Sequence, residues 1–312
     1  MRIAIFGTGG AAGYFGARLA QAGEDVFFIA RGEHLRAIQQ HGLHVESVKG
    51  DVDIHPARAT SDPAEVGPVD AVVLGVKTWQ VRESAEAMRP LIGPETVVLP
   101  LQNGVEVCQQ LAEVLGSEHV LGGLATIISY IVAPGRLRHE GGPCSIAFAE
   151  LDNRPSERVE RLRAAIDHAG VSVTVPANIQ SALWSKLLFV SSLGGLGAVT
   201  RAPAGVLRRL PETRRLLEAA MHEVRAVALA HGVPVNEDQI TIATANVDSL
   251  SEGGTMSLQR DIIAGRPSEL DAWNGAVMRL GQATGVDVPT HTFIYEALLP
   301  QERRARGLER FD

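Results

Sequence analysis

Short apolar runs alternate with amphipathic segments through the first third of the chain. The apolar runs, which are typical of buried parallel strands, are residues 2–6, 25–31, 70–76 and 96–101. The helical patterns that follow the first three of them are residues 14–22, 33–41 and 81–91. Strands that alternate with helices in this way predict a parallel sheet with helices packed on its faces.

Further segments before residue 177 carry β patterns. Residues 43–54, interrupted by Lys49-Gly50-Asp51, predict a hairpin. The stretch 120–148 contains β-rich runs separated by Gly-Gly and Pro-Gly pairs, and it predicts antiparallel strands that complete the sheet. An amphipathic helix at 156–168 and a last strand at 171–175 end this part of the chain.

The pattern changes after residue 177, where strand signals disappear. The helical runs beyond that point are residues 179–193, 211–231, 237–250, 275–284 and 290–299. We therefore expect two domains, an α/β domain at 1–177 and an all-helical C-terminal domain at 178–312. The charged tail, 301–312, is expected to be solvated or frayed.

A glycine-rich turn joins the first apolar run to the first helix. It reads Gly7-Thr8-Gly9-Gly10-Ala11-Ala12-Gly13, with Ala12 at the third fingerprint position. Gly7 permits a tight turn, Gly9 lets a pyrophosphate approach the backbone, and the helix start directs N–H groups at that phosphate. We therefore expect a Rossmann-type doubly wound sheet that binds a dinucleotide cofactor, with an ordinary βα turn as the alternative. The expected cofactor-binding residues of this turn are Gly7, Thr8, Gly9, Gly10, Ala11 and Ala12.

The end of the second strand bears on the choice of nucleotide. A site that prefers NAD places an Asp or Glu near the adenosine ribose, about 20 residues beyond the glycines. Here the strand ends in Ala30-Arg31, so a guanidinium suited to a phosphate replaces the carboxylate. We expect Arg31 to bind the 2′-phosphate of NADP(H). The alternative is a solvated surface arginine, and Glu33 lies close enough in sequence to keep that alternative open.

Composition excludes several classes of protein. The net charge of −7 over 312 residues does not favour binding to nucleic acid or to anionic lipid. No uninterrupted apolar run approaches the ~18 residues of a membrane span, and the N-terminus does not resemble a signal peptide. Cys108 and Cys144 have no metal-type spacing. We expect a cytoplasmic protein that holds no metal.

Lysine is rare in this chain, which has three lysines and 26 arginines. Arginine does not release a proton in proteins, whereas lysine does when burial lowers its pKa, so the retained lysines are candidates for chemistry. Lys77 follows the strand 70–76, at the sheet edge where ligands collect, or else it is a solvated strand-end residue. Lys186 lies in the most apolar helix of the second half, where it needs a partner or a role unless its amine reaches solvent. Lys49 is expected in a loop.

Three polar residues complete the set of candidates. Asn103 follows the strand 96–101 and can orient a nicotinamide or a substrate oxygen, although Asn-Gly is also ordinary turn chemistry. Glu269 is expected in the first turn of a helix that begins near Pro267, where a carboxylate also serves as a favourable helix-end charge. Ser257 opens another helix. Lys186, Glu269 and Ser257, facing the edge where a dinucleotide binds, form a plausible site for reducing a 2-keto acid.

As a set, these segments resemble the ketopantoate reductase (2-dehydropantoate 2-reductase) family. The matching pieces run in order along the chain: 7–9 with Arg31, 76–80, 101–105, 184–187, Ser257 with Asp261, and 265–275. The resemblance implies an active site in the cleft between a Rossmann domain and a helical domain, with NADPH as hydride donor. It also implies Lys186 as general acid and Glu269 as substrate binder.

The same resemblance implies further roles and a reaction. Lys77, Gln80 and Asn103 belong to the cofactor side, and Asn103 and Ser257 also contact the substrate. The implied reaction reduces 2-dehydropantoate to pantoate, a step of pantothenate biosynthesis. The partner is a small-molecule keto acid, with no nucleic acid or membrane, and a homodimer is one oligomeric state that stays open.

One departure from the family pattern affects the substrate. Well-known members carry asparagines four and eight residues after the catalytic lysine, where this chain has Val190 and Gly194. Ser191 or Ser192 is a candidate to compensate. Two alternatives to ketopantoate reduction therefore remain, namely reduction of another branched or bulkier 2-keto acid, and a non-catalytic NADP(H)-binding sensor.

Overall fold

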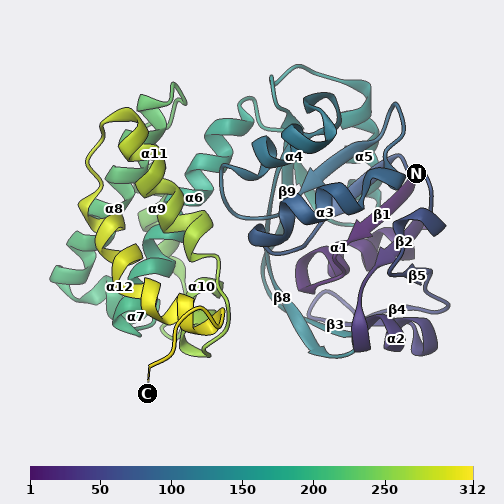
Figure 1. The fold of residues 1–312 in the computed structure, drawn as a ribbon, viewed down its shortest axis with the longest axis horizontal. Helices are drawn as coiled ribbons and strands as arrows, with labels where there is room; N and C mark the ends of the chain where they lie inside the picture. The colour runs from purple at the N-terminus through teal and green to yellow at the C-terminus, as the bar shows by residue number, and fades with distance from the viewer. Residues whose placement is uncertain (312) are drawn as a thin grey trace. The chain divides into compact units, whose positions relative to one another are not determined.

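The computed structural model describes residues 1–311, which divide into two units. The first unit contains residues 1–102 and 107–179 (Figure 1, purple to teal). The second unit contains residues 103–106 and the chain from residue 180 onward. The short segment 103–106 therefore packs with the second unit although its neighbours in sequence belong to the first.

The first unit is built around a parallel sheet of five strands in the order β5-β2-β1-β6-β7. Its strands are β1 (Arg2–Phe6), β2 (Asp25–Ile29), β5 (Ala59–Thr60), β6 (Ala71–Leu74) and β7 (Val97–Pro100). The central strand β1 is in register with both neighbours, with Ile5 opposite Phe28 of β2 and Val73 of β6. Their side chains are buried, as expected for a sheet covered on both faces.

A second sheet in the same unit has the order β10-β9-β3-β4, and β8 pairs with β9. Its strands are β3 (Leu43–Ser47), β4 (Val52–Ile54), β8 (Leu121–Ala133), β9 (Arg136–Glu150) and β10 (Ser172–Thr174). The predicted hairpin at 43–54 is confirmed by the antiparallel β3–β4 pair. The expectation that 120–148 completes the first sheet is wrong. Those residues form the long β8–β9 hairpin of the second sheet, and an isolated bridge pairs Val120 with Val98 of β7.

Helix α1 (Gly10–Gln21) packs against strands of both sheets, and its glycines make that packing close. A methyl group added at Gly16 would lie 2.5 Å from Ile5 of β1, and one added at Gly13 would lie 2.7 Å from Leu137 of β9. The remaining helices of the unit are α2 (Gly32–His41), α3 (Val81–Ala87), α4 (Val107–Leu115) and α5 (Glu157–His168). Ser156 caps α5 by accepting a hydrogen bond from the Val159 amide.

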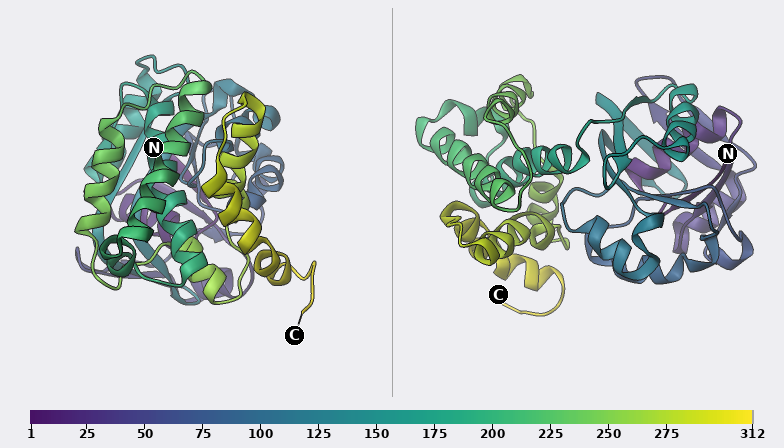
Figure 2. Two further views of the ribbon diagram at one scale, coloured as in Figure 1. Left: turned by 90° about the vertical axis from the view of Figure 1, so that its left-hand side faces the viewer. Right: turned by 90° about the horizontal axis from the view of Figure 1, so that it is seen from above.

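Helices joined by loops make up the second unit, and its described residues contain no strand (Figure 2, green to yellow in the left view). Its helices are α6 (Ile179–Thr200), α7 (Ala204–Arg209), α8 (Pro211–Ala230), α9 (Asp238–Ser249), α10 (Ser257–Ile263), α11 (Ala276–Thr284) and α12 (Pro289–Ala305). A π-helical turn at Asp271–Gly275 precedes α11. Helix α12 continues past Pro300 to Ala305, so the expectation of a solvated tail from residue 301 is wrong for its first residues, and Glu302 is 4% exposed.

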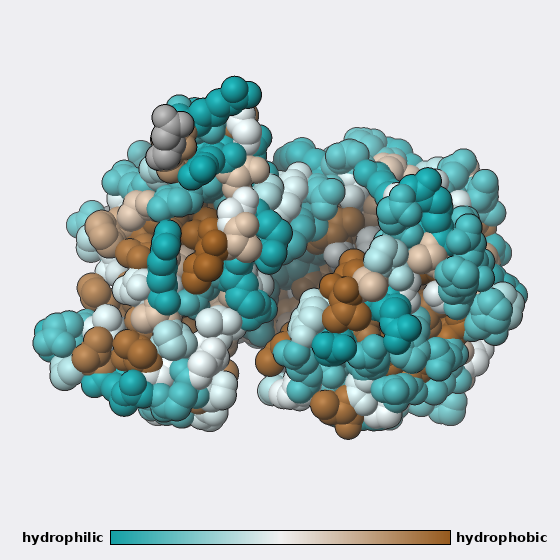
Figure 3. Space-filling view, turned by 90° about the horizontal axis from the view of Figure 1, so that it is seen from below, coloured by the Kyte–Doolittle hydropathy of each residue, from teal (hydrophilic) through white to brown (hydrophobic). Residues whose placement is uncertain are grey.

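Helix α6 supplies much of the core of the second unit. It is the one helix of residues 1–311 that is long and apolar enough to cross a membrane by length and composition, but 72% of that apolar window is buried inside the structure. The core helix of a globular domain shows the same pattern. Figure 3 shows one face of the molecule, on which hydrophilic residues predominate and hydrophobic residues form separate clusters.

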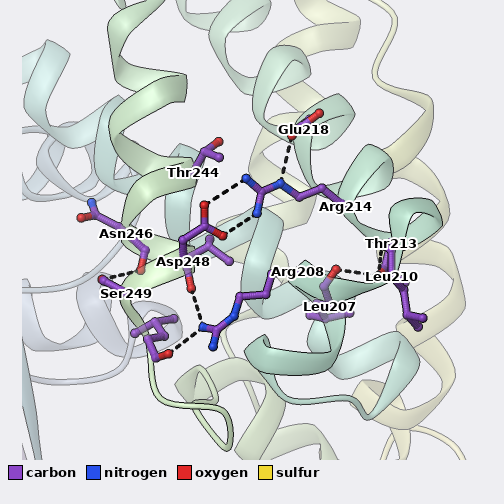
Figure 4. Close-up of polar contacts among 12 residues, drawn as sticks. Leu207, Arg208, Leu210, Thr213, Arg214, Glu218, Thr244, Asn246, Asp248 and Ser249 are labelled. Carbon is purple, nitrogen blue, oxygen red and sulfur yellow. Dashed lines mark hydrogen bonds and ion pairs between the residues drawn. The ribbon is translucent and has the colours of Figure 1, made fainter.

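Arginine side chains connect helices of the second unit through hydrogen bonds and ion pairs. The Arg214 guanidinium donates to both carboxylate oxygens of Asp248, at 2.6 and 3.1 Å, and to Glu218 at 3.0 Å (Figure 4). Arg208 donates to the carbonyl of Leu250 at 2.6 Å. These bonds join α7 and α8 to the end of α9.

The start of α1 provides a test of this packing. A methyl group at Gly10 would lie 2.6 Å from the Cα of Tyr130 in β8, whereas one at Gly9 would meet only ordinary contacts, the nearest at 3.7 Å. We therefore expect Gly10→Ala to lower the free energy of unfolding by roughly 1–3 kcal/mol, the usual cost of overpacking. Gly9→Ala is the matched control and should leave it nearly unchanged.

Urea unfolding followed by circular dichroism measures both variants. Alanine is the better helix former, so without the β8 contact Gly10→Ala would stabilise the protein. A stability equal to or above that of the wild type would contradict the packing described for α1 and β8.

Candidate active site

The glycine-rich turn is bonded to the carboxyl end of β2. The amides of Gly7 and Thr8 donate to the carbonyl of Ile29 at 3.1 and 3.2 Å, and the Thr8 hydroxyl donates to the same oxygen at 3.1 Å. Gly7 has a φ of +86°, and a side chain there would collide with Val76. The turn is thereby held at the edge of the sheet from which Arg31 also emerges.

The start of α1 presents backbone donors at this edge. Gly9 is the N-cap, and the first intrahelical bond runs from the Gly13 amide to the Gly9 carbonyl at 2.8 Å. The amides of Gly10, Ala11 and Ala12 therefore have no acceptor within the helix, which is the arrangement that binds phosphate groups. The absence of a side chain at Gly9 leaves room for such a group, so the residues present fit a dinucleotide.

The alanine at the third fingerprint position has a structural explanation. A methyl group at Gly75, just beyond β6, would collide with the Cβ of Ala12. Gly75 therefore supplies the room that a glycine at position 12 would otherwise give, and α1 can approach the sheet closely. A pattern search confined to the turn misses this compensation.

Three other side chains lie beyond the carboxyl ends of the strands. Arg31 is 64% exposed, and its guanidinium lies 3.6 Å from the carboxylate of Glu83. The backbone amide of Lys77 donates to the side chain of Gln80 at 3.3 Å, and the Lys77 amine lies 5.9 Å from the centre of the Trp79 ring. Strands β2 and β6 are both hydrogen-bonded to β1, so these residues follow strands that flank the glycine-rich turn.

Gln102 has a role that sequence reasoning did not assign. Its amide nitrogen donates to the carbonyls of Leu74 and Val76, at 3.1 and 2.9 Å, and its side chain is buried. It thus joins the end of β7 to the end of β6, just before Lys77. In the sequence, the polar residues 102–104 indicated that this segment has a role. That pattern favoured Asn103 and gave no role to Gln102.

Asn103 belongs to the segment that packs with the second unit. Val105 contacts the core of that unit, and Glu106 forms an ion pair with Arg279 at 2.8 Å. An added methyl at Gly104 would lie 3.4 Å from the carbonyl of Ala272. Asn103 is therefore carried beside the residues that directly follow Glu269.

Lys186 lies near the middle of α6, between the buried residues Trp184 and Leu187. Burial lowers the pKa of its ammonium to about 8, because the charged form loses hydration in the apolar surroundings. A lysine with such a pKa can exchange a proton near neutral pH, whereas the surrounding side chains of α6 cannot.

The sequence predicts that Glu269 lies in the first turn of a helix. In the structure Glu269 instead directly precedes the helix. Its carbonyl accepts a hydrogen bond from the Trp273 amide at 3.0 Å, and the helical turn begins at Leu270. The side chain is 9% exposed. The π-helical turn that follows is a geometry found frequently at functional sites.

Gly194 is the point where three candidate segments meet. An added methyl there would lie 3.0 Å from the Trp273 ring and 3.3 Å from Met256, the residue before Ser257. Gly194 lies on the same face of α6 as Lys186, about 12 Å further along at the helical rise of 1.5 Å per residue. The part of α6 that follows Lys186 thus packs against the segments that carry Ser257 and Glu269.

Val190 and Gly194, the two expected departures from the family pattern, are buried. Val190 is 3% exposed, and the Trp273 indole occupies the space beside Gly194. Ser191 is engaged elsewhere, because its hydroxyl contacts His291 at 3.2 Å and the other ring nitrogen of His291 contacts Glu223 at 2.9 Å. Sequence reasoning missed this Glu223–His291 pair, since its members lie 68 residues apart.

No group of three or more potential metal ligands occurs among residues 1–311. The chemistry available is that of a phosphate-binding turn, a lysine with a lowered pKa and a buried glutamate.

The chain matches known proteins over nearly its whole length. Residues 3–153 match the family model of ketopantoate reductase PanE/ApbA, and residues 178–302 match the model of its C-terminal part. A 2-dehydropantoate 2-reductase from Mesorhizobium japonicum is 32% identical over 97% of both chains. The crystal structure of 2-dehydropantoate 2-reductase from Geobacter metallireducens GS-15 has a TM-score of 0.90 at 32% identity, covering 96% of this chain and 99% of that one.

A more distant structure shares the fold. The ternary structure of D-mandelate dehydrogenase with NADH and anilino(oxo)acetate has a TM-score of 0.90 at 23% identity, covering 98% of this chain and all of the other.

The doubly wound sheet, the helical second unit and these matches define an oxidoreductase of the Rossmann type. The chain belongs to the ketopantoate reductase family.

The lowered pKa of Lys186 can be measured directly, because the chain has three lysines. In protein labelled with ¹³C at lysine Cε, we expect one of the three NMR signals to titrate with a midpoint near pH 8. That signal should be missing from Lys186→Met. Because an exposed lysine titrates near ~10.4, the unfolded chain binds this proton more tightly, and the free energy of unfolding should rise between pH 8 and 10.

The same rise should be absent from Lys186→Met, which serves as the matched control. If the Lys186 signal shows that the amine stays protonated up to pH 10, this would contradict the assigned burial of the amine.

Proposed function

We propose that the protein reduces a 2-keto acid with NADPH, and that the substrate is 2-dehydropantoate, which becomes pantoate. Membership of the ketopantoate reductase family supports the reaction class. The phosphate-binding start of α1 and the exposed Arg31 support the cofactor. The observation that carries the proposal is Lys186, whose pKa burial lowers to about 8 in the helix that contacts the Glu269 and Ser257 segments.

In this proposal each side chain has a distinct task. The nicotinamide, when bound, supplies the hydride that reduces the keto carbon. Lys186 donates a proton from Nζ to the keto oxygen as it becomes a hydroxyl. Glu269 accepts a hydrogen bond from a substrate hydroxyl, and Ser257 donates one to the substrate carboxylate. Lys77, Gln80 and Asn103 orient the cofactor, and Asn103 also contacts the substrate.

A second candidate substrate is a 2-keto acid with a bulkier apolar side chain. It is favoured by one observation, that Val190 and the Trp273 ring beside Gly194 give this face of α6 an apolar character. An apolar surface recognises hydrocarbon better than it recognises the hydroxyl of ketopantoate. The distant D-mandelate dehydrogenase structure contains an aryl carboxylate, anilino(oxo)acetate, which is a reason to include aryl 2-keto acids in the test.

The test is a panel of ketopantoate, branched 2-keto acids and aryl 2-keto acids, followed by NADPH absorbance with wild type and Lys186→Ala. We expect the wild type to give its highest kcat/KM with ketopantoate. Lys186→Ala should lower kcat by roughly 10²–10⁴-fold, the usual contribution of a general acid. Its affinity for NADPH should stay unchanged.

Lys49→Ala removes a lysine from an exposed turn and is the matched control. Full activity of Lys186→Ala would eliminate the proposed general acid. A higher kcat/KM for a bulkier keto acid would replace ketopantoate as the substrate.

The role of Arg31 is tested by the difference between the two nicotinamide cofactors. A charge-assisted hydrogen bond contributes about 1.5–3 kcal/mol, so Arg31→Ala should weaken NADPH binding by roughly 10- to 100-fold. NADH binding should change little, because NADH lacks the 2′-phosphate. Fluorescence titration of both cofactors measures the two affinities.

Arg163→Ala, which removes an exposed arginine from an ion pair with Glu160 on α5, controls for the loss of surface charge. Equal weakening of NADPH and NADH by Arg31→Ala would show that the guanidinium does not recognise the 2′-phosphate.

A further inference from the structure

The C-terminal helix contributes a buried carboxylate that the proposed reaction does not use. Glu302 of α12 is 4% exposed, although the sequence around it is charged. Burial of a carboxylate is costly unless hydrogen bonds and an opposite charge compensate for the lost hydration. The partners of this carboxylate therefore indicate what it does.

Those partners converge on the residue before Glu269. The Glu302 carboxylate accepts hydrogen bonds from the Ser268 amide at 3.0 Å and from the Ser268 hydroxyl at 2.6 Å. It also accepts one from Arg306 at 2.6 Å. Arg306 in turn donates to the carbonyl of Ser268 at 3.0 Å. One ion pair thus binds the amide, the hydroxyl and the carbonyl of Ser268.

These bonds fix the backbone that carries Glu269. The Ser268 carbonyl belongs to the peptide group that joins Ser268 to Glu269, so Arg306 sets the orientation of that group. On the other side, the Leu270 amide donates to the Ser268 hydroxyl at 3.3 Å, and the Glu269 carbonyl accepts from the Trp273 amide at 3.0 Å. Glu269 is therefore held between two anchored peptide groups.

We propose that Glu302 and Arg306 are positioning residues, which act on the substrate through Glu269. The inference rests on the proposed role of Glu269 in binding the substrate hydroxyl. A carboxylate that binds a ligand must be held within a fraction of an ångström of the productive position. The loop at 264–269 has no regular structure of its own, and the ion pair on α12 supplies that restraint.

The primary variant is Glu302→Gln, which keeps the size of the side chain and removes its charge. Its amide has one acceptor oxygen where the carboxylate has two, so either Ser268 or Arg306 loses a partner. We expect the KM for the keto acid to rise about 10-fold, with a much smaller change in kcat, because the contact is made to bound substrate. The affinity for NADPH should not change.

The matched control is Asp248→Asn, which breaks the bidentate pair with Arg214 on α8 and α9 (Figure 4). It also removes a carboxylate charge from the second unit and should lower stability, but it should leave the KM unchanged. Ser268→Ala is a milder variant that loses the hydroxyl bonds to Glu302, at 2.6 Å, and from the Leu270 amide, at 3.3 Å, but keeps the Glu302–Arg306 pair, and it keeps the test available if Glu302→Gln folds poorly. It should raise KM by a smaller factor.

A double-mutant cycle separates positioning from a general loss of structure. If Glu302 acts through Glu269, then Glu302→Gln should change KM little in a Glu269→Ala background. Equal factors in both backgrounds would overturn the proposal. So would a KM increase in Asp248→Asn as large as that in Glu302→Gln.

Hydrogen–deuterium exchange provides a readout that does not depend on turnover. The amides of residues 268–273 should exchange faster in Glu302→Gln than in the wild type, and Asp248→Asn should leave them unchanged. If the wild type reduces no keto acid, the proposed function fails, and the exchange data still decide whether Glu302 anchors this backbone. Unchanged exchange in Glu302→Gln would overturn the positioning role.

Discussion

The second unit depends on how it accommodates a lysine within its most apolar helix. Helix α6 contributes to the helical core, and buried apolar side chains, among them Trp184 and Leu187, lie on both sides of Lys186 along the helix. Removing an ammonium from water is costly, and the protein responds by lowering the pKa of that group to about 8. A proton held this loosely can be transferred near neutral pH. Burial of this ammonium is unfavourable for stability, and the same burial makes Lys186 suitable as a proton donor.

The first unit meets a different constraint, which is close approach of backbones. Helix α1 packs against both sheets, and Gly10, Gly13 and Gly16 each face a different strand. The glycine-rich turn therefore serves packing as well as phosphate binding. Gly75 shows the same principle, since it accommodates Ala12 where the usual pattern has a glycine.

Periodicity was sufficient to predict the elements that are locally determined. It gave the parallel strands, the hairpin at 43–54 and the long helices, because each shows its pattern within a short window. It failed for β8 and β9. These strands belong to a second sheet because β9 pairs with β3, which lies about 90 residues away in sequence. It also failed for Glu302, because a charged residue in a charged tail gives no sign of its burial.

Some residues of the candidate site could be predicted from the sequence, and others could not. Lys186 could be selected from the sequence because lysine is rare and its neighbours are apolar, and the glycine-rich turn could be selected by its motif. Gln102, His291 and Glu302 could not, since each acts on residues that are distant in sequence. Gly194 was noted as a departure, but only the packed structure reveals the Trp273 ring beside it.

Proton donation by Lys186 is tested by the pH dependence of kcat/KM, measured with ketopantoate as substrate and NADPH at saturation. A general acid must be protonated to act, and burial lowers the pKa of Lys186 to about 8. We therefore expect kcat/KM to be constant below that pH and to fall about tenfold for each pH unit above it. A rate that stays constant, or rises, from pH 8 to pH 10 would contradict it.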